Sequence, residues 1–267
     1  PAAMALPVQH PNGLESIMNF AFTEQQNAIR DSVARFSADV LAPGYRQRDR
    51  DGRIEREVIA QMGEMGLLGG ELPEEFGGSG LDCVTAGLII EELARGDFNV
   101  AYIPLLTSLN GQIIAQYAES SLAREWLSEM TAGRKVACIA LTEPGGGSDA
   151  ASLRLKAELK GDVYVLNGEK TSISMADQAD VAVVFARTGT VEQRASGISA
   201  FLVPMNLPGI STTRFEDAGE RADGVAGDPL GQGRIGAREQ QAVNDQDDRG
   251  DRATQRAHGA YLLVADM

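Results

Sequence analysis

The sequence has few of the side chains on which metal and triad chemistry depend. Among its 267 residues are two histidines, His10 and His258, and two cysteines, Cys83 and Cys138, which form no CxxC pair. A zinc site with cysteine and histidine ligands is therefore not expected, and neither is a Ser-His-Asp triad. Both cysteines lie in apolar surroundings, so we expect reduced, buried thiols in a cytoplasmic protein.

Basic residues are also scarce. Lysine and arginine number 24 against 38 aspartate and glutamate residues, which gives a net charge of -14. Because nucleic-acid binding needs a basic surface, we expect no nucleic-acid partner. No apolar run approaches the roughly 18 residues of a membrane-spanning helix, so we expect no membrane partner. A hydrophobic content of 43% provides material for a core.

The N-terminal part of the chain begins without a regular pattern. Residues 1–17 show no period and contain several prolines, so we expect a flexible extension, with Met18 as the natural start. Thr23 and Gln26 then form a capping-box pattern, which predicts a helix that begins near Phe22.

Apolar residues at helical spacing continue to about residue 131. Pro43-Gly44 is expected to end the first helix. Later helices are predicted at about 55–65, from Asp82 onwards, at 99–118 and at 121–131. The prediction is an all-helical N-terminal domain over residues 18–135, in which the apolar helix 99–118 is central.

After Gly133 the apolar period changes from 3.6 to 2, which indicates strands. Lys160-Gly161-Asp162 is a hairpin signal, and Asn167-Gly168 is expected to be a second tight turn. The predicted strands are 136–141, 153–159, 163–166, 181–186, 198–203 and 210–215. We therefore predict a middle domain over residues 136–222 with a β-barrel or sandwich-like fold, and an α+β fold class for the chain.

The β pattern stops near Ala222. Residues 223–267 are rich in aspartate, glycine, glutamine and arginine, and they have little apolar character before Tyr261-Leu262-Leu263-Val264. Such a composition buries too little apolar surface to offset the entropy of ordering. We predict an irregular, mostly disordered tail with at most a short terminal helix or strand.

A glycine-rich stretch, Thr142-Glu143-Pro144-Gly145-Gly146-Gly147-Ser148-Asp149, follows the first predicted strand. Its three successive glycines remove every Cβ from the turn, so the backbone can approach a ligand closely. Amides and hydroxyls suit a polar, anionic or planar ligand. The stretch contains neither GxGxxG nor GxxxxGK[ST], so it is not a Rossmann or P-loop fingerprint. An ordinary glycine-rich turn remains the alternative.

Several motifs, taken in order, resemble those of the acyl-CoA dehydrogenase family. They are Phe22-Thr23-Glu24-Gln25-Gln26, Met65-Gly66-Leu67-Leu68, Pro73-Glu74-Glu75-Phe76-Gly77-Gly78-Ser79-Gly80, Glu91-Glu92, Leu141-Thr142-Glu143-Pro144-Gly145-Gly146-Gly147-Ser148-Asp149 and Leu166-Asn167-Gly168-Glu169-Lys170. The resemblance covers about residues 18–222. Its specific part is the LTEPG-x-GSD loop followed by L-N-G-x-K.

The resemblance implies a helical N-terminal domain, a middle β domain and a C-terminal helical domain with FAD between them, usually in a homotetramer. It also implies an acyl-CoA substrate, which loses its α-proton to a glutamate base and its β-hydride to the flavin. Electron-transfer flavoprotein or a similar protein is the implied acceptor. Because a thioester α-C–H is a weak acid, the carbonyl oxygen must be held by hydrogen bonds as charge develops.

The resemblance also assigns a flavin site by position. Its residues are Ile139, Ala140, Leu141, Thr142, Gly147, Ser148, Ser172, Ile173 and Ser174, and Ser148 is also expected to face the acyl-CoA. Many family members have Trp-Ile-Thr where this chain has Ser172-Ile173-Ser174. Ser174 can replace the threonine hydroxyl, but Ser172 cannot replace an aromatic shield. The hypothesis is a more open flavin edge that suits a bulkier, for example alicyclic, acyl group.

Each of these side chains also has a purely structural interpretation. Leu141 is typical of a strand core, and Thr142 and Ser148 are typical of turn caps. Glu143 is expected to act structurally rather than as the base. The paired carboxylates Glu74-Glu75 and Glu91-Glu92 are expected to be charges on a loop and a helix surface.

The family pattern is not continued after Ala222, where family members have further strands and then the helices that carry the catalytic glutamate. We therefore assign no catalytic base, and we expect a frameshifted or truncated chain with impaired activity and a largely missing family interface for oligomers. Two other functions stay open. One is a non-enzymatic remnant that binds flavin or acyl-CoA weakly, and the other is flavin monooxygenase chemistry on the same fold.

Overall fold

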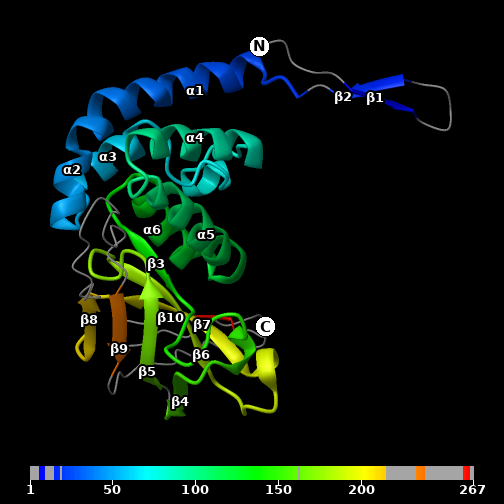
Figure 1. Ribbon diagram of the computed structural model, residues 1–267. Helices are drawn as coiled ribbons and strands as arrows, with labels where there is room; N and C mark the ends of the chain where they lie inside the picture. Colours follow the sequence, from blue (N-terminus) through cyan, green and yellow to red (C-terminus); the bar gives the residue numbers. More distant parts are fainter. Residues whose placement is uncertain are drawn as a thin grey trace.

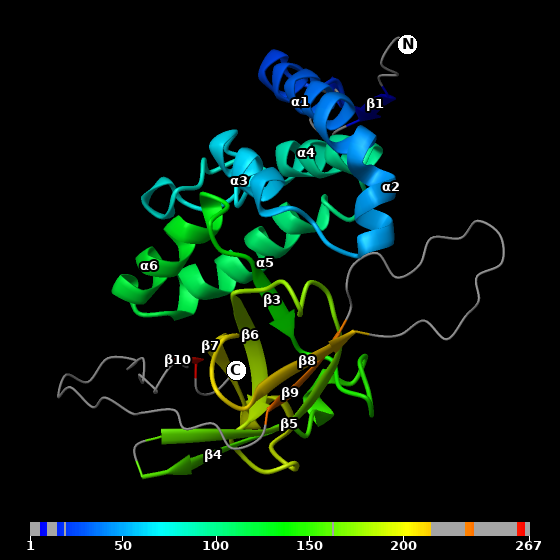
Figure 2. The same ribbon diagram turned by 90° about the vertical axis from the view of Figure 1, so that its left-hand side faces the viewer.

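The computed structural model describes residues 6–9, 15–18, 20–161, 163–214, 233–237 and 261–264. A group of helices lies above a mixed β-sheet (Figure 1). The view in Figure 2 shows the same two layers, with α5 and α6 next to the sheet and α1 farthest from it. The α+β class, with the helices first along the chain, is confirmed.

The helices follow the predicted order. They are α1 (Glu24–Phe36), α2 (Ala42–Asp51), α3 (Arg56–Glu64), α4 (Cys83–Gly96), α5 (Tyr102–Tyr117) and α6 (Ser120–Thr131). The capping box is present: the Thr23 hydroxyl accepts from the Gln26 amide at 3.1 Å, and the Gln26 side chain accepts from the Thr23 amide at 3.0 Å. Asp82 caps α4 by accepting from the Thr85 amide at 2.8 Å.

The expected helix end at Pro43-Gly44 is wrong. The chain passes from α1 through a π-helical turn, Ser37–Leu41, directly into α2, and Pro43 lies in the first turn of α2. Proline has no N–H with which to continue the hydrogen-bond pattern, and Pro43 stands where that pattern changes from the π turn to α2. Pro43 therefore accompanies the start of a helix rather than the end of one.

The main sheet contains eight described strands. They are β3 (Ala137–Ala140), β4 (Lys156–Lys160), β5 (Val163–Ile173), β6 (Val181–Arg187), β7 (Ile198–Pro204), β8 (Ile210–Arg214), β9 (Gly233–Ala237) and β10 (Tyr261–Val264). Their order is β10-β7-β6-β4-β5-β9-β8, and β3 pairs with β6 in parallel. The hairpin predicted at Lys160 joins β4 to β5, with Lys160 opposite Val163.

The second expected turn, Asn167-Gly168, is wrong, because β5 runs straight through it. Gly168 has a φ of 149°, and a Cβ built there would lie 2.8 Å from the Cα of Leu155. A glycine inside a strand often marks such a close backbone approach. Here it lets β5 pass the chain just before β4.

Strands also form in two regions where none or few were expected. In the N-terminal extension, β1 (Leu6–Gln9) and β2 (Glu15–Met18) pair antiparallel. In the tail, β9 pairs with β5 and β8, and β10 pairs with β7. The terminal strand was foreseen as an option, whereas β9 was not. Disorder in the rest of the tail was predicted for residues that lie outside the described ones.

The core continues from the helices into the sheet. One face of β6 presents Val181, Val183 and Phe185 to a cluster that includes Leu127 and Met130 of α6. The other face turns its alternate residues into a second cluster within the β part. Every residue of β6 is buried, so this strand is the central element that holds both layers together.

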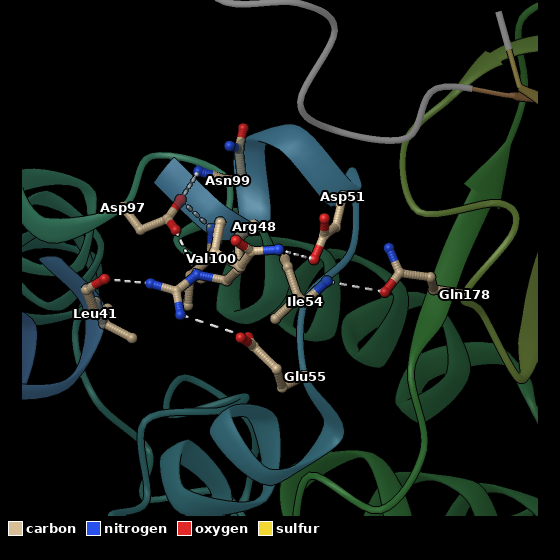
Figure 3. Close-up of polar contacts among 10 residues, drawn as sticks. Leu41, Arg48, Asp51, Ile54, Glu55, Asp97, Asn99, Val100 and Gln178 are labelled. Atoms are coloured by element: carbon tan, nitrogen blue, oxygen red, sulfur yellow. Dashed lines mark hydrogen bonds and ion pairs between the residues drawn. The ribbon is translucent and has the colours of Figure 1, made fainter. Parts of the chain in front are cut away.

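A buried arginine organises the helical part (Figure 3). Arg48 donates from Nε to the Asp97 carboxylate at 2.6 Å and from its guanidinium to the carbonyl of Leu41, at the end of the π turn. In the same view the Ile54 amide donates to the Gln178 side chain at 3.0 Å. That hydrogen bond joins the loop before α3 to the segment that follows β5.

The expectation that both cysteines are buried is confirmed for Cys138 and wrong for Cys83. Cys138 lies within β3, inside the core of the β part. Cys83 is the first residue of α4, where a side chain faces solvent next to the exposed cap Asp82. Both thiols are free.

Candidate functional site

The two segments assigned to the ligand site lie side by side. The glycine-rich loop follows β3, and residues 171–174 form the end of β5 and the turn after it. The Thr171 amide donates to the carbonyl of Thr142 at 2.9 Å. Segments that are some thirty positions apart in the sequence are thus connected through their backbones at the first hydroxyl residue of the loop.

The loop itself closes on a reciprocal pair of hydrogen bonds. The amide of Glu143 donates to the carbonyl of Gly146 at 3.2 Å, and the amide of Gly146 donates back at 3.1 Å. A Cβ built on Gly145 or Gly146 would meet no atom within 4 Å, and one on Gly147 would meet only Thr142, at 3.5 Å. The glycines are therefore not required by the packing of the protein, and their open faces fit a ligand that lies against the backbone.

The expected site residues divide into two kinds. Ala140 and Ile173 point into the core of the β part, so only their backbones are available to a ligand. The others have partly or fully exposed side chains: Ile139, Leu141, Thr142 and Ser174 are half-buried, and Gly147, Ser148 and Ser172 are exposed. The hydroxyls of Thr142, Ser148, Ser172 and Ser174 are thus on the accessible rim.

Ser172 lies at an irregularity of the sheet. The register between β5 and β9 shifts between Lys170 and Ile173, and Ser172 has a φ of 57°. Left-handed backbone is unfavourable for residues other than glycine, asparagine and aspartate. At this bulge the Ser172 side chain is exposed, one residue after the Thr171 amide that bonds to Thr142.

Beneath the loop lies a buried ion pair that the sequence did not reveal. Lys170 is completely buried, and its Nζ lies 2.9 Å from Glu143 Oε1 and 2.9 Å from the carbonyl oxygen of Leu141. Glu143 also accepts from the amides of Arg154 at 2.6 Å and Leu155 at 2.8 Å. The motif L-N-G-x-K contains this lysine. Its burial follows only from the fold, in which β5 places Lys170 against Leu141 and Glu143.

These contacts set the protonation of the pair. Burial would raise the pKa of Glu143, but the hydrogen bonds from Leu155, Lys170 and Arg154 together with the lysine charge outweigh it and hold the pKa below its ordinary value. Burial lowers the pKa of Lys170, against the opposing effect of the Glu143 carboxylate. The lowered pKa keeps the Glu143 carboxylate ionised, whereas burial works against the charge of Lys170 even with its partner in place.

An apolar face of α5 is exposed. Phe98, just before α5, contacts Tyr102 edge to face, with ring centroids 5.4 Å apart. Leu105 and Leu109 follow one and two turns further along α5, and both are exposed, as is Phe98. Within α5, the spacing of Tyr102, Leu105 and Leu109 places them on one side of the helix.

The paired carboxylates are as expected for surface charges, with one exception. Glu74, Glu75 and Glu91 are exposed, whereas Glu92 is buried and lies 3.4 Å from Arg95. Within the described ranges, no group of three histidine, cysteine, aspartate or glutamate side chains is arranged to hold a metal ion. No helix in that part of the chain is long and apolar enough to cross a membrane.

The structure is that of an α+β protein in which helices pack on a β-sheet, with an open glycine-rich loop hydrogen-bonded to the end of a bulged strand. The comparisons with known proteins identify the family. Residues 23–134 match the acyl-CoA dehydrogenase N-terminal domain, and residues 138–228 match the acyl-CoA dehydrogenase middle domain. The chain belongs to the acyl-CoA dehydrogenase family.

Among similar proteins, the short-chain specific acyl-CoA dehydrogenase of rat mitochondria (Rattus norvegicus) is 36% identical over 208 residues, which cover 76% of this chain and 50% of the relative. A glutaryl-CoA dehydrogenase from Mycobacterium smegmatis, solved in complex with FADH2, has a TM-score of 0.73 at 26% identity, over 83% of this chain and 54% of that one. The chain spans about half the length of the relatives it matches.

A second similar structure comes from work on the electron transferring flavoprotein of Acidaminococcus fermentans and flavin-based electron bifurcation. It has a TM-score of 0.75 at 33% identity and covers 85% of this chain and 58% of that one.

Proposed function

We propose that this chain carries the flavin- and acyl-CoA-binding part of an oxidoreductase that dehydrogenates an acyl-CoA thioester between its α and β carbons. The observation that carries the proposal is the junction between the loop at Thr142–Ser148 and the turn at Ser172–Ser174. There, open glycines and exposed hydroxyls lie beside each other and are fixed by the Thr171–Thr142 hydrogen bond.

The residues present fit FAD, which the M. smegmatis relative contains in its reduced form. The open Cβ positions of Gly145 and Gly146 allow a planar group to approach the backbone. Backbone groups from Ile139 to Thr142, with Gly147, Ser148 and the segment Ser172–Ser174, would hold it. FAD supplies the acceptor for the β-hydride.

The same arrangement offers a path for the substrate. Ser148 is exposed on the rim of the loop and is proposed to face the acyl-CoA. The apolar patch of Phe98, Tyr102, Leu105 and Leu109 suits an acyl chain, because it is uncharged and Phe98, Leu105 and Leu109 are exposed. We assign the α-proton to no base among the described residues, since the carboxylates there are surface charges or, like Glu143, structurally paired.

The partners and the location are also proposals. An electron-transferring flavoprotein is the proposed acceptor, and the bifurcating system of A. fermentans, to which one similar structure belongs, supports this assignment. Assembly with further copies of the chain is proposed from the family. The two free cysteines support a cytoplasmic location.

The first test is retention of FAD. The purified chain is mixed with FAD and passed through gel filtration, and the visible spectrum of the protein peak is recorded. Flavin bands that remain with the protein are the expected result. A colourless peak would reject the flavin site.

A matched pair of variants locates that binding. Gly146→Val fills the open face of the loop, whereas Gly87→Val places the same side chain at an equally open position on the exposed surface of α4. We expect Gly146→Val to weaken FAD binding by at least about tenfold, which corresponds to 1.4 kcal/mol. Gly87→Val should bind FAD like the wild type. Equal affinities in both variants would place the flavin elsewhere.

The second test concerns the reaction. If a base outside the described residues takes the α-proton, anaerobic addition of an acyl-CoA should bleach the flavin band, and an electron-transferring flavoprotein should restore it. Retained flavin that no acyl-CoA bleaches would instead favour a binding module or flavin monooxygenase chemistry.

The exposed position of Ser172 further suggests room for a bulky acyl group. An alicyclic acyl-CoA should then bleach the flavin at least as fast as a straight-chain one. Bleaching by straight chains alone would reject this preference.

A further inference from the structure

The buried lysine of β5 makes contacts that reach beyond a simple ion pair. Its Nζ lies 2.9 Å from the carbonyl oxygen of Leu141 and 2.9 Å from Glu143 Oε1. The next residue, Thr171, donates its amide to the carbonyl of Thr142 at 2.9 Å. Leu141 and Glu143 therefore accept hydrogen bonds from Lys170, and Thr142 between them accepts one from Thr171.

Glu143 extends this connection to a third segment. Its two carboxylate oxygens accept from the amides of Arg154 and Leu155, at 2.6 and 2.8 Å, while its backbone forms the reciprocal pair with Gly146. Glu143 thus joins the turn of the loop to the chain that enters β4. A single side chain fixes the loop against both neighbouring strands of the hairpin.

Burying this ion pair costs desolvation free energy, which an apolar pair filling the same space would avoid. The Lys170 side chain is 0% exposed and that of Glu143 is 10% exposed. A well-packed apolar pair is often as stable as a buried ion pair or more so. What an apolar pair lacks is direction, because only hydrogen bonds fix the carbonyl of Leu141 and the turn at Gly146 relative to β5.

We propose that Lys170, held by Glu143, is a positioning residue that fixes the glycine-rich loop against the Ser172–Ser174 turn. This inference rests on the proposed flavin site for its functional consequence, but its structural part stands without a ligand. Removing the ammonium group should release the loop and leave the sheet intact.

The experiment compares the wild type with Lys170→Met, Glu143→Gln and the double variant. Lys160→Met serves as the control, because Lys160 is exposed at the end of β4. Hydrogen exchange of the amides of Glu143, Gly146 and Thr171 measures the order of the loop without any flavin. The FAD dissociation constant, the position of the bound flavin band and the thermal midpoint are measured on the same samples.

We expect Lys170→Met to accelerate exchange of these amides at least about tenfold, while amides in β6 and β7 exchange at the wild-type rate. Its FAD dissociation constant should rise about tenfold, with a shifted flavin band, because the loop no longer has one orientation. Glu143→Gln should show the same changes to a smaller extent. Lys160→Met should resemble the wild type in every measurement.

The double variant separates positioning from stability. It removes the uncompensated charge that either single change leaves, so its thermal midpoint should recover toward that of the wild type. Its exchange rates and its flavin affinity should stay altered. The proposal is wrong if the double variant has wild-type exchange rates and wild-type flavin affinity. It is also wrong if the exchange rates of the loop amides in Lys170→Met stay within about twofold of the wild-type rates.

Failure of the flavin site is distinguishable from failure of this inference. If the wild type binds no FAD, the proposed function fails, and the exchange rates of the loop amides still decide whether Lys170 positions the loop. If Lys170→Met does not fold, the decision passes to Glu143→Gln and the double variant. Wild-type exchange at Gly146 and Thr171 in both of them would overturn the proposal.

Discussion

Arg48 and Asp97 form a buried ion pair that ties α2 to the end of α4. The distance from Arg48 Nε to Asp97 Oδ2 is 2.6 Å, and the side chains are 3% and 0% exposed. Asp97 also accepts from the backbone amide of Asn99 at 3.0 Å, where the chain turns toward α5. The pair therefore sets the start of the helix whose exposed face we assign to the acyl chain.

Loss of this arginine should be strongly destabilising. We expect Arg48→Met to lower the free energy of unfolding by about 3–5 kcal/mol, because it leaves the Asp97 carboxylate buried without its partner. Denaturant unfolding followed by circular dichroism measures the change. Arg46→Met is the matched control: Arg46 lies on the same helix and is exposed. A change below about 1 kcal/mol for Arg48→Met, or equal changes for both variants, would contradict the assignment.

The two cysteines should differ in reactivity. Burial raises the pKa of Cys138 to about 12, whereas Cys83 is exposed on the first turn of α4. Only a thiolate reacts readily with an alkylating agent. Brief treatment of the folded protein at neutral pH should therefore label Cys83 alone, and denaturant should allow labelling of both. Peptide mass spectrometry identifies the labelled residues, and modification of Cys138 in the folded protein would show that the core of the β part opens.

The sequence was sufficient where local physical effects decide the structure. Thr23 and Gln26 form the predicted capping box, and α4 begins after Asp82 as predicted, because capping depends on residues within one turn. It was misleading where a residue has two common uses. Pro43 lies in the first turn of a helix instead of ending one, and Gly168 serves a close approach to Leu155 instead of a turn.

The site shows the same division. The motifs identified the loop and the Ser172–Ser174 segment, and the structure places them together through Thr142 and Thr171. Spacing along the sequence could not predict the contact between Lys170 and Glu143. The two residues meet only because β4 pairs with β5 in the folded chain. The roles of these residues toward flavin and acyl-CoA stay predictions until binding is measured.

The backbone at Ser172 provides a test of the bulge. A φ of 57° is unfavourable for most side chains and worst for β-branched ones. We expect Ser172→Val to lower the free energy of unfolding by about 1–2 kcal/mol, while Ser172→Gly stays within about 1 kcal/mol of the wild type. Ser211→Val, at an exposed position on β8, should be nearly neutral and serves as the control. Equal effects of the two valines on denaturant unfolding would show that Ser172 is not held in the left-handed region.

Glu143 should make the stability of the protein depend on acid pH. The folded-state pKa of Glu143 lies below the ordinary value of 4.5, so the folded protein binds the proton more weakly than the unfolded chain does. The contribution of Glu143 to stability is therefore fully present above pH 4.5 and is lost as the pH falls through the lowered pKa. The lowered pKa of Lys170 likewise makes stability rise with pH, in the alkaline range below 10.5.

Removing the carboxylate should remove the acid part of this dependence. We expect the thermal midpoint of Glu143→Gln to fall less steeply than that of the wild type as the pH is lowered below 4.5, because glutamine does not titrate. Glu158→Gln, at an exposed position on β4, should follow the wild-type curve. Midpoints measured by calorimetry at several acid pH values decide the matter. Parallel curves for Glu143→Gln and the wild type would mean that the carboxylate gains no net stabilisation from Lys170 and the two amides, and the positioning role of the pair would then lose its energetic basis.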